Sequence, residues 1–168
     1  MAEKGVYDMD LQTRIAEKMD AIIRDIQDLI AIKSVGEPTK PGMPFGEGCA
    51  RALEAALAMG ESLGFRSKNL DNYAGYLEMG EGEELIGILT HVDVVPEGDV
   101  SHWHYPPYGH TFENGRIYGR GASDNKGPTI LAMYAMALLR DMGVPLHKRI
   151  RLIIGANEET GFRCMEHY

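Results

Sequence analysis

The feature of this sequence that most constrains its fold is an almost continuously apolar run, Leu85–Leu89, that leads directly into His91 and Asp93. Such a run is typical of a central β-strand buried on both faces of a sheet. A second buried-type run, Arg149–Ile154, is followed closely by two adjacent glutamates. Two strands that end in polar residues predict an open α/β sheet with a functional site at the strand ends.

Helices are predicted before and between these strands. From about Asp10 to Ile32, apolar side chains recur every three or four residues, which is typical of an amphipathic helix. A second helix is expected over Glu47–Leu63, with Gly64 as its C-cap residue. A third is expected over Lys126–Met142, before a glycine and a proline that would end it.

Shorter runs complete the expected secondary structure. Phe65–Leu70, Tyr73–Met79 and Arg116–Tyr118 are predicted strands bounded by turn residues. Pro96–Asn114 is predicted to be a long loop, and loops of this length are often functional. The order of elements predicts a three-layer α/β/α domain with a mixed central sheet.

The composition is that of an acidic globular protein. A chain of 168 residues is long enough for one domain with a substantial core. The net charge of −8 disfavours nucleic acid or an anionic membrane surface as a partner. The sequence has no apolar run long enough to span a membrane. Reduced thiols at Cys49 and Cys164 and a polar N-terminus lead us to expect a cytoplasmic protein.

His91 and Asp93 have the spacing of side chains that point to the same face of an extended strand. A histidine that binds metal through one ring nitrogen usually donates its other N–H to an acceptor, often a carboxylate. Asp93 could support His91 in this way, directly or through a neighbour. A His-x-Asp triplet also arises by chance, so a surface ion pair is the alternative for this pair alone.

Asp124 follows Gly119 and Gly121 and comes just before the third predicted helix. The two oxygens of a carboxylate at such a turn can bridge two cations. The Gly-x-Gly pattern also begins a dinucleotide-binding motif. In that motif a third glycine would replace Asp124, whose charge would repel a pyrophosphate. A metal ligand is therefore the preferred interpretation.

Glu158 and Glu159 follow the second apolar run. Adjacent acids at a strand-to-helix turn point in different directions, so one can bind a metal while the other acts on a water molecule. An acidic helix N-terminus is the simpler alternative. No single motif decides the case. The joint placement of histidine, aspartate and glutamate at predicted strand ends favours a hydrolytic metal site.

Three motifs together resemble those of the M20 metallopeptidase family: His91–Pro96, Gly119–Pro128 and Glu158–Gly161. Within it, the likeness is greatest to the dipeptidase V branch of carnosinase-like Xaa-His dipeptidases, to which Asn114–Gly121 and Cys164–Tyr168 also point. The resemblance implies hydrolysis of Xaa-His or other dipeptides with two zinc ions, for which manganese or cobalt can substitute.

The resemblance also implies a role for each motif residue. His91 would bind one zinc ion, Asp124 would bridge both ions, and Glu159 would be another metal ligand. Asp93 would support His91 from behind, and Glu158 would be the general base. The peptide bond that follows Asp124 is expected to be cis, as it is in this family.

Two features depart from the family pattern. Asn125 stands where many relatives have aspartate, which is a mild change. Family members are several hundred residues long, with a lid or dimerisation domain and two more metal ligands downstream. Residues 1–168 are therefore expected to form the N-terminal portion of the catalytic domain, incomplete because the chain is short, without the lid.

These observations lead to one preferred hypothesis and two alternatives. The preferred one is a zinc dipeptidase in the full-length protein, with the isolated chain inactive. The alternatives are a truncated module that binds metal weakly or not at all, and a hydrolase of N-acyl amino acids from the same family. Self-association through exposed sheet edges and apolar surface is also expected. The other histidines are expected at the surface rather than as ligands: His102, His104, His110, His147 and His167. The alternative is that His102 or His104 is recruited as a substitute ligand.

Overall fold

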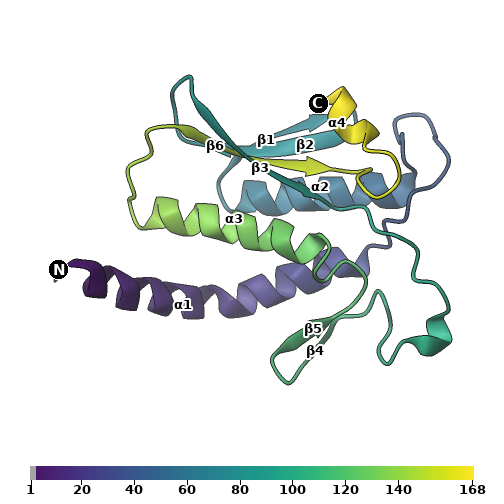
Figure 1. Ribbon diagram of the computed structural model, residues 1–168, viewed down its shortest axis with the longest axis horizontal. Coiled ribbons are helices and arrows are strands. Elements are labelled where there is room, and N and C mark those ends of the chain that lie inside the picture. Colours follow the sequence, from purple (N-terminus) through teal and green to yellow (C-terminus); the bar gives the residue numbers. More distant parts are fainter. Residues whose placement is uncertain (1–2) are drawn as a thin grey trace.

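A four-stranded sheet with the strand order β1-β2-β6-β3 lies at the centre of the fold (Figure 1). β1 (Arg66–Leu70) and β2 (Ala74–Met79) are antiparallel. β6 (Arg149–Gly155) pairs antiparallel with β2 and parallel with β3 (Leu85–His91). This computed structural model describes residues 3–168, with side chains described from residue 11 onward. The first two residues, part of the polar N-terminus, lie outside the description.

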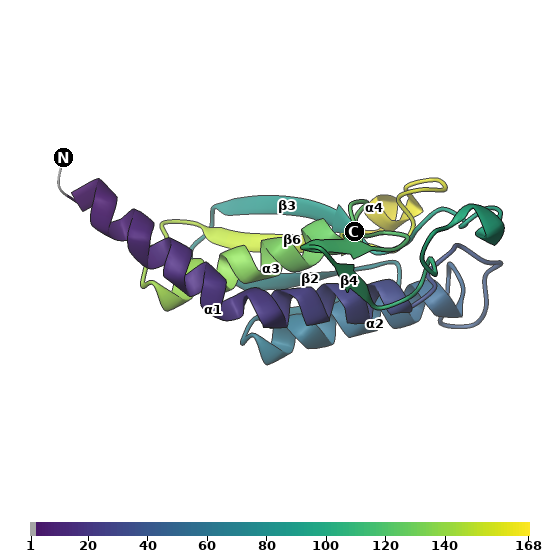
Figure 2. The same ribbon diagram turned by 90° about the horizontal axis from the view of Figure 1, so that it is seen from below.

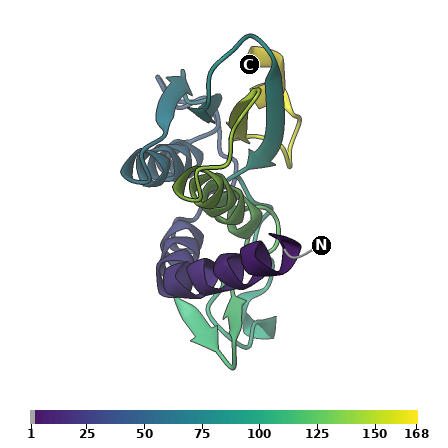
Figure 3. The ribbon, with the colours of Figure 1, turned by 90° about the vertical axis from the view of Figure 1, so that its left-hand side faces the viewer.

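Three long helices pack in layers on one side of the sheet. α2 (Glu47–Ser62) and α3 (Lys126–Asp141) cover one sheet face, and α1 (Glu3–Ala31) lies beyond them (Figure 3). Figure 2 shows the N-terminal end of α1 projecting past the sheet. The short α4 (Arg163–His167) lies at one end of the sheet. Tyr168, directly after it, makes a T-shaped ring contact with Tyr76 of β2. The expected α/β fold with a mixed sheet is confirmed.

The predicted helices occupy the expected segments. α1 begins earlier than expected, at Glu3 rather than near Asp10, and α4 was not predicted. Gly64 follows α2 with a φ of 88°, as a C-cap glycine should. Both cysteines are free and buried, as predicted. None of the described helices has the length and apolar character needed to cross a membrane.

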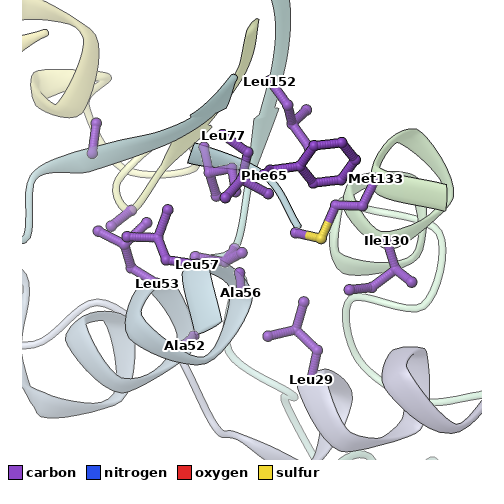
Figure 4. Close-up of a cluster of buried hydrophobic side chains, with 14 of the residues drawn as sticks. Leu29, Ala52, Leu53, Ala56, Leu57, Phe65, Leu77, Ile130, Met133 and Leu152 are labelled. Atoms are coloured by element: carbon purple, nitrogen blue, oxygen red, sulfur yellow. The ribbon is translucent and has the colours of Figure 1, made fainter. Parts of the chain in front are cut away.

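The core lies between the sheet and the helices (Figure 4). β6 alternates half-buried and buried side chains, and its buried set faces α2 and α3. This two-residue period is what a pleated strand with one covered face requires. The largest fully buried apolar side chains include Leu29, Ile30, Leu53, Leu77, Ile130, Met133, Met136, Leu152 and Ile154.

β3 is an edge strand, which corrects the prediction that its apolar run is central and buried on both faces. Its side chains Leu85, Ile86 and Leu89 are 40%, 49% and 51% exposed. β6 occupies the central position instead, and within residues 3–168 no strand pairs with the other edge of β3. An apolar composition shows that a strand is suited to burial, but its neighbours decide whether it is buried.

The strand predicted at Arg116–Tyr118 is present as β5, but it lies outside the main sheet. It forms a separate hairpin with β4 (Thr111–Glu113), next to α1 (Figure 1). Asn114 and Gly115 connect the two strands with φ values of 53° and 73°, as a tight hairpin turn requires. The segment predicted as one long loop therefore contains β4 and a short 3-10 helix, Val100–His102.

Candidate metal centre

The parallel strands β3 and β6 bring the predicted site residues to one rim of the sheet. His91 at the end of β3 lies opposite Gly155 at the end of β6, so the segments that follow leave the sheet on the same side. Asp124 comes from the turn before α3. Three ligand atoms, one each from His91, Asp124 and Glu159, lie within 4.8 Å of one another. The structure thus brings together the three residues expected to bind metal.

The His91 ring is buried and held at both nitrogens. Its Nδ1 lies 3.0 Å from the main-chain oxygen of Asp93 and 3.4 Å from the Asp93 carboxylate. Its Nε2 lies 3.1 Å from Asp124 Oδ1 and 3.7 Å from Glu158 Oε2. With a proton on Nδ1, the ring donates to Asp93 and turns Nε2 towards the acidic groups. The predicted contact between Asp93 and the His91 ring is therefore shortest at the main-chain carbonyl of Asp93.

The Asp93 carboxylate has a second function that the sequence did not suggest. It is 2% exposed and accepts hydrogen bonds from the main-chain N–H groups of Glu158 at 2.9 Å and Glu159 at 3.0 Å. It therefore holds the turn that presents both glutamates. One residue links the end of β3 to the segment after β6.

The electrostatics of the cluster favour a bound cation. Burial alone would lower the pKa of His91, but hydrogen bonds and charge from Asp93, with charge from Glu158, raise it to about 9. Burial raises the pKa of Glu159, and the neighbouring charge of Asp124 adds to that effect. Carboxylates crowded around one imidazole repel one another, and a cation at the centre relieves this repulsion.

The turn before α3 has a backbone that only glycine suits. Gly121 has a φ of 88°, and a Cβ there would lie 2.9 Å from Val94 Cγ1 and 3.1 Å from Lys126 Cδ. The peptide bond between Asp124 and Asn125 is cis, which confirms the expectation from the family resemblance. The turn is thus packed tightly against the segment that follows β3.

Two buried polar residues of α3 lie next to the cluster, and no sequence motif predicted a role for either. Lys126 is 0% exposed, and its Nζ donates to the main-chain oxygen of Ile32 at 2.5 Å. Burial lowers the pKa of Lys126 to about 8. Thr129 is also 0% exposed, and its hydroxyl lies 2.8 Å from the main-chain oxygen of Asn125 and 3.3 Å from that of His91. One signal was available, because a lysine in the first turn of a helix opposes the helix dipole.

A cleft of about 290 Å³ opens beside the cluster. His91, Asp124 and Glu158 form its polar side, and Phe162 and Met165 line it further along. The Glu158 side chain is 43% exposed. A small substrate could therefore reach the acidic groups. The remaining five histidines are all exposed, as predicted.

The residues present fit a divalent transition metal. One imidazole nitrogen and two carboxylate oxygens form a donor set typical of catalytic zinc, which takes three protein ligands and leaves a position open. The cleft supplies the open side. The His91 ring is held from behind through Nδ1, as metal-binding histidines usually are.

Comparison with known proteins gives a family match for the second half of the chain. Residues 87–168 match the sequence model of peptidase family M20/M25/M40. The resemblance expected from the three motifs is thereby confirmed for the part of the chain that contains His91, Asp124 and Glu159.

A curated relative named as a putative dipeptidase matches nearly the whole chain. The chain is 49% identical over 162 residues to "Putative dipeptidase YtjP" of Bacillus subtilis (strain 168), and the match covers 95% of this chain and 35% of YtjP. The chain thus spans about a third of the length of this curated relative.

Two solved structures share the fold. Human carnosine dipeptidase 1 has a TM-score of 0.77 at 27% identity, with 92% of this chain and 35% of that chain covered. The M20 family metallo-carboxypeptidase Sso-CP2 of Sulfolobus solfataricus has a TM-score of 0.68 at 26% identity, with 82% and 31% covered. The family implies a metal cofactor, and the cluster of His91, Asp124 and Glu159 is where one fits.

Proposed function

We propose that the full-length protein is a metal-dependent dipeptidase. The observation that carries this proposal is the cluster of His91, Asp124 and Glu159, whose ligand atoms lie within 4.8 Å of one another beside an open cleft. The 49% identity to a relative named as a dipeptidase supports the substrate class. Xaa-His dipeptides or a broader set of dipeptides are the proposed substrates.

The proposed metal is zinc, with manganese or cobalt as substitutes, and the full-length protein would hold two ions. His91 would bind one ion, Asp124 would bridge the pair, and Glu159 would be a further ligand. A bound divalent metal polarises a carbonyl group and lowers the pKa of a bound water. The residues of this chain supply the position of those ions and the charge that retains them.

Glu158 is the proposed general base. Its carboxylate lies 3.7 Å from His91 Nε2, lines the cleft and is 43% exposed. From there it can take a proton from the attacking water and pass it to the leaving amine of the cleaved amide. The Asp93 carboxylate, through the main-chain N–H of Glu158, holds the base in place.

We further propose that residues 1–168 contribute the N-terminal portion of the catalytic domain. Their match to YtjP covers 35% of that protein, which leaves room for further ligands and a lid domain elsewhere in the full-length protein. By this proposal the isolated 168-residue chain hydrolyses no dipeptide. A cytoplasmic location stays a prediction from the sequence.

The test is hydrolysis by the full-length gene product loaded with zinc. We expect cleavage of dipeptides, strongest for Xaa-His, loss of activity with a chelator, and recovery when zinc is restored. Glu158→Gln should lower kcat about 100-fold or more. Cleavage of N-acyl amino acids but not of dipeptides would support the amidohydrolase alternative. Activity that survives complete metal removal would contradict the metal-dependent mechanism.

A further inference from the structure

The segment 32–35, directly after α1, is bound to the part of the centre that carries His91. The Ser34 hydroxyl donates to the main-chain oxygen of Val92 at 2.6 Å. The main-chain N–H of Val94 donates to the oxygen of Ser34 at 3.0 Å. Ser34 itself is 0% exposed, so these bonds are shielded from water. The end of β3 therefore cannot shift without breaking buried hydrogen bonds to this segment.

The same segment is bound to the part of the centre that carries Asp124. Lys126 donates from Nζ to the Ile32 oxygen at 2.5 Å, and its main-chain N–H donates to the oxygen of Gly121 at 3.0 Å. The lysine stem lies against Gly121, because a Cβ there would be only 3.1 Å from Lys126 Cδ. The turn around Asp124 is thus tied to segment 32–35 by one side chain.

A fully buried lysine lowers the stability of the folded protein unless other interactions compensate for the loss of hydration. An ammonium group taken wholly out of water loses its hydration, and an apolar side chain would fill the same space without that loss. Lys126 also stands at the N-terminal end of α3, where the helix dipole disfavours a cation. In compensation, its charge lies near the buried Asp93 carboxylate and at the carbonyl end of α1.

We propose that Lys126 is a positioning residue for the metal centre, acting through segment 32–35 to set the Asp124 carboxylate opposite His91. The segment is the common anchor for the two parts of the chain that supply these ligands. The 3.1 Å separation of His91 Nε2 and Asp124 Oδ1 depends on it. This inference rests on the proposed function, because it assumes that His91 and Asp124 hold a metal ion.

The test uses the full-length gene product, freed of metal and titrated with Co²⁺, whose visible absorption reports the ligand geometry. Lys126→Met keeps most of the side-chain volume and removes the hydrogen bond. It should weaken Co²⁺ binding about 10- to 100-fold, as loss of supporting contacts to metal ligands does, and it should change the absorption bands. The matched control is Tyr134→Phe, which removes a different hydrogen bond made by α3, the 2.7 Å bond from the Tyr134 hydroxyl to the Asp25 carboxylate in α1.

Tyr134→Phe should leave Co²⁺ affinity and spectrum unchanged even where it lowers Tm as much as Lys126→Met does. Equal loss of affinity in both variants at equal Tm would show that Lys126 is only structural.

Ser34→Ala is a milder second variant that cuts the bond to Val92 and leaves Lys126 in place. It should also weaken Co²⁺ binding, and unchanged affinity in it would overturn the common anchor even if Lys126→Met does not fold.

Metal binding by the wild-type protein distinguishes failure of the proposed function from failure of the role proposed for Lys126. A wild-type protein that binds neither Co²⁺ nor Zn²⁺ overturns the proposed function, and the positioning role with it. Tight wild-type binding that Lys126→Met leaves unchanged, in affinity and in spectrum, overturns the positioning role alone.

Discussion

The Asp93 carboxylate accepts a hydrogen bond at 2.9 Å from the main-chain N–H of Glu158, which is 65 residues further along the chain. Its other oxygen accepts from Glu159 at 3.0 Å. Because Asp93 also contacts the His91 ring through its carbonyl, it connects the proposed metal ligand to the proposed general base. A carboxylate that accepts two buried N–H bonds cannot be replaced by an amide without loss.

Asp93→Asn should therefore destabilise the protein and weaken metal binding together. The amide group turns an NH₂ towards one of the two main-chain N–H groups, which then has no acceptor. A buried donor without a partner costs about 1–3 kcal/mol. Metal affinity should fall about 10- to 100-fold. Urea denaturation and zinc titration measure the two effects.

Asp99→Asn is the matched control for this substitution. The Asp99 carboxylate also accepts two hydrogen bonds, from Ser101 N at 2.9 Å and Ser101 Oγ at 2.7 Å, but in an exposed turn. Asparagine caps such a turn about as well as aspartate, so the free energy of unfolding should stay close to that of the wild type. Similar losses in Asp93→Asn and Asp99→Asn would contradict the role given to Asp93.

The two adjacent glutamates should separate metal binding from proton transfer. Glu159→Gln removes a charge from the cluster, so the purified full-length protein should retain less zinc. Glu158→Gln should keep its zinc and lose about 100-fold or more in kcat, because an amide cannot accept the water proton. Metal analysis and steady-state kinetics on both variants decide the assignment. The opposite pattern would exchange the two roles.

Much of the candidate site was predictable because its residues stand at strand ends. The apolar runs locate β3 and β6, and their parallel pairing brings the residues that follow them to one rim. The edge position of β3 was not predictable, since two apolar runs in one chain do not reveal which is central. The strand order is set by pairing across the whole sheet, which no local pattern records.

The supporting contacts were hidden for a different reason. Lys126 reaches the main-chain oxygen of Ile32 across 94 positions in the sequence. Any residue at position 32 would offer the same main-chain oxygen, so the identity of Ile32 does not reveal the contact. The lysine itself suggests a surface position, because lysines are almost never fully buried. Such contacts become visible only when the packing of α1 against α3 is known.

Gly60→Ala should destabilise the protein although alanine favours helices. In a helix interior alanine is better than glycine by about 1 kcal/mol. A Cβ on Gly60, however, would lie 2.1 Å from Leu77 Cδ1, and overpacking of this kind costs about 1–3 kcal/mol. We expect a net loss in urea denaturation. Gly87→Ala is the control, because its Cβ would meet only Ile153 Cδ1 at 3.6 Å. That variant should be neutral or gain up to about 1 kcal/mol.

Glu78 should make stability depend on pH in the acid range. Burial alone would raise the pKa of Glu78, but hydrogen bonds and charge from Arg151 and Arg149 lower it below its usual value of 4.5. A carboxyl whose pKa is lower in the folded state stabilises the protein above the unfolded pKa. That contribution is lost as the pH falls through the folded pKa. The free energy of unfolding should therefore fall more steeply in the wild type than in Glu78→Gln as the pH is lowered below 4.5.

The loss of stability in Glu78→Gln at neutral pH can be compared with that in a control variant, Glu81→Gln. Glu78→Gln should lose about 1–3 kcal/mol at pH 7, because it weakens charged hydrogen bonds to several arginines. Glu81→Gln removes a carboxylate that is 88% exposed and, among the described residues, pairs only with Arg66, so the free energy of unfolding should change little. Parallel pH profiles for Glu78→Gln and the wild type would show that other groups carry the acid sensitivity.

The open edge of β3 should cause the isolated 168-residue chain to self-associate. Leu85 is 40% exposed, and an apolar strand with unpaired main-chain groups attracts other strands. Leu85→Lys places a charge on this edge and should shift the chain towards monomer in light scattering across a concentration series. Val100→Lys adds the same charge to an apolar side chain that is 53% exposed in a short 3-10 helix, away from the sheet. Equal effects of both substitutions would point to net charge, rather than the edge of β3, as the cause of association.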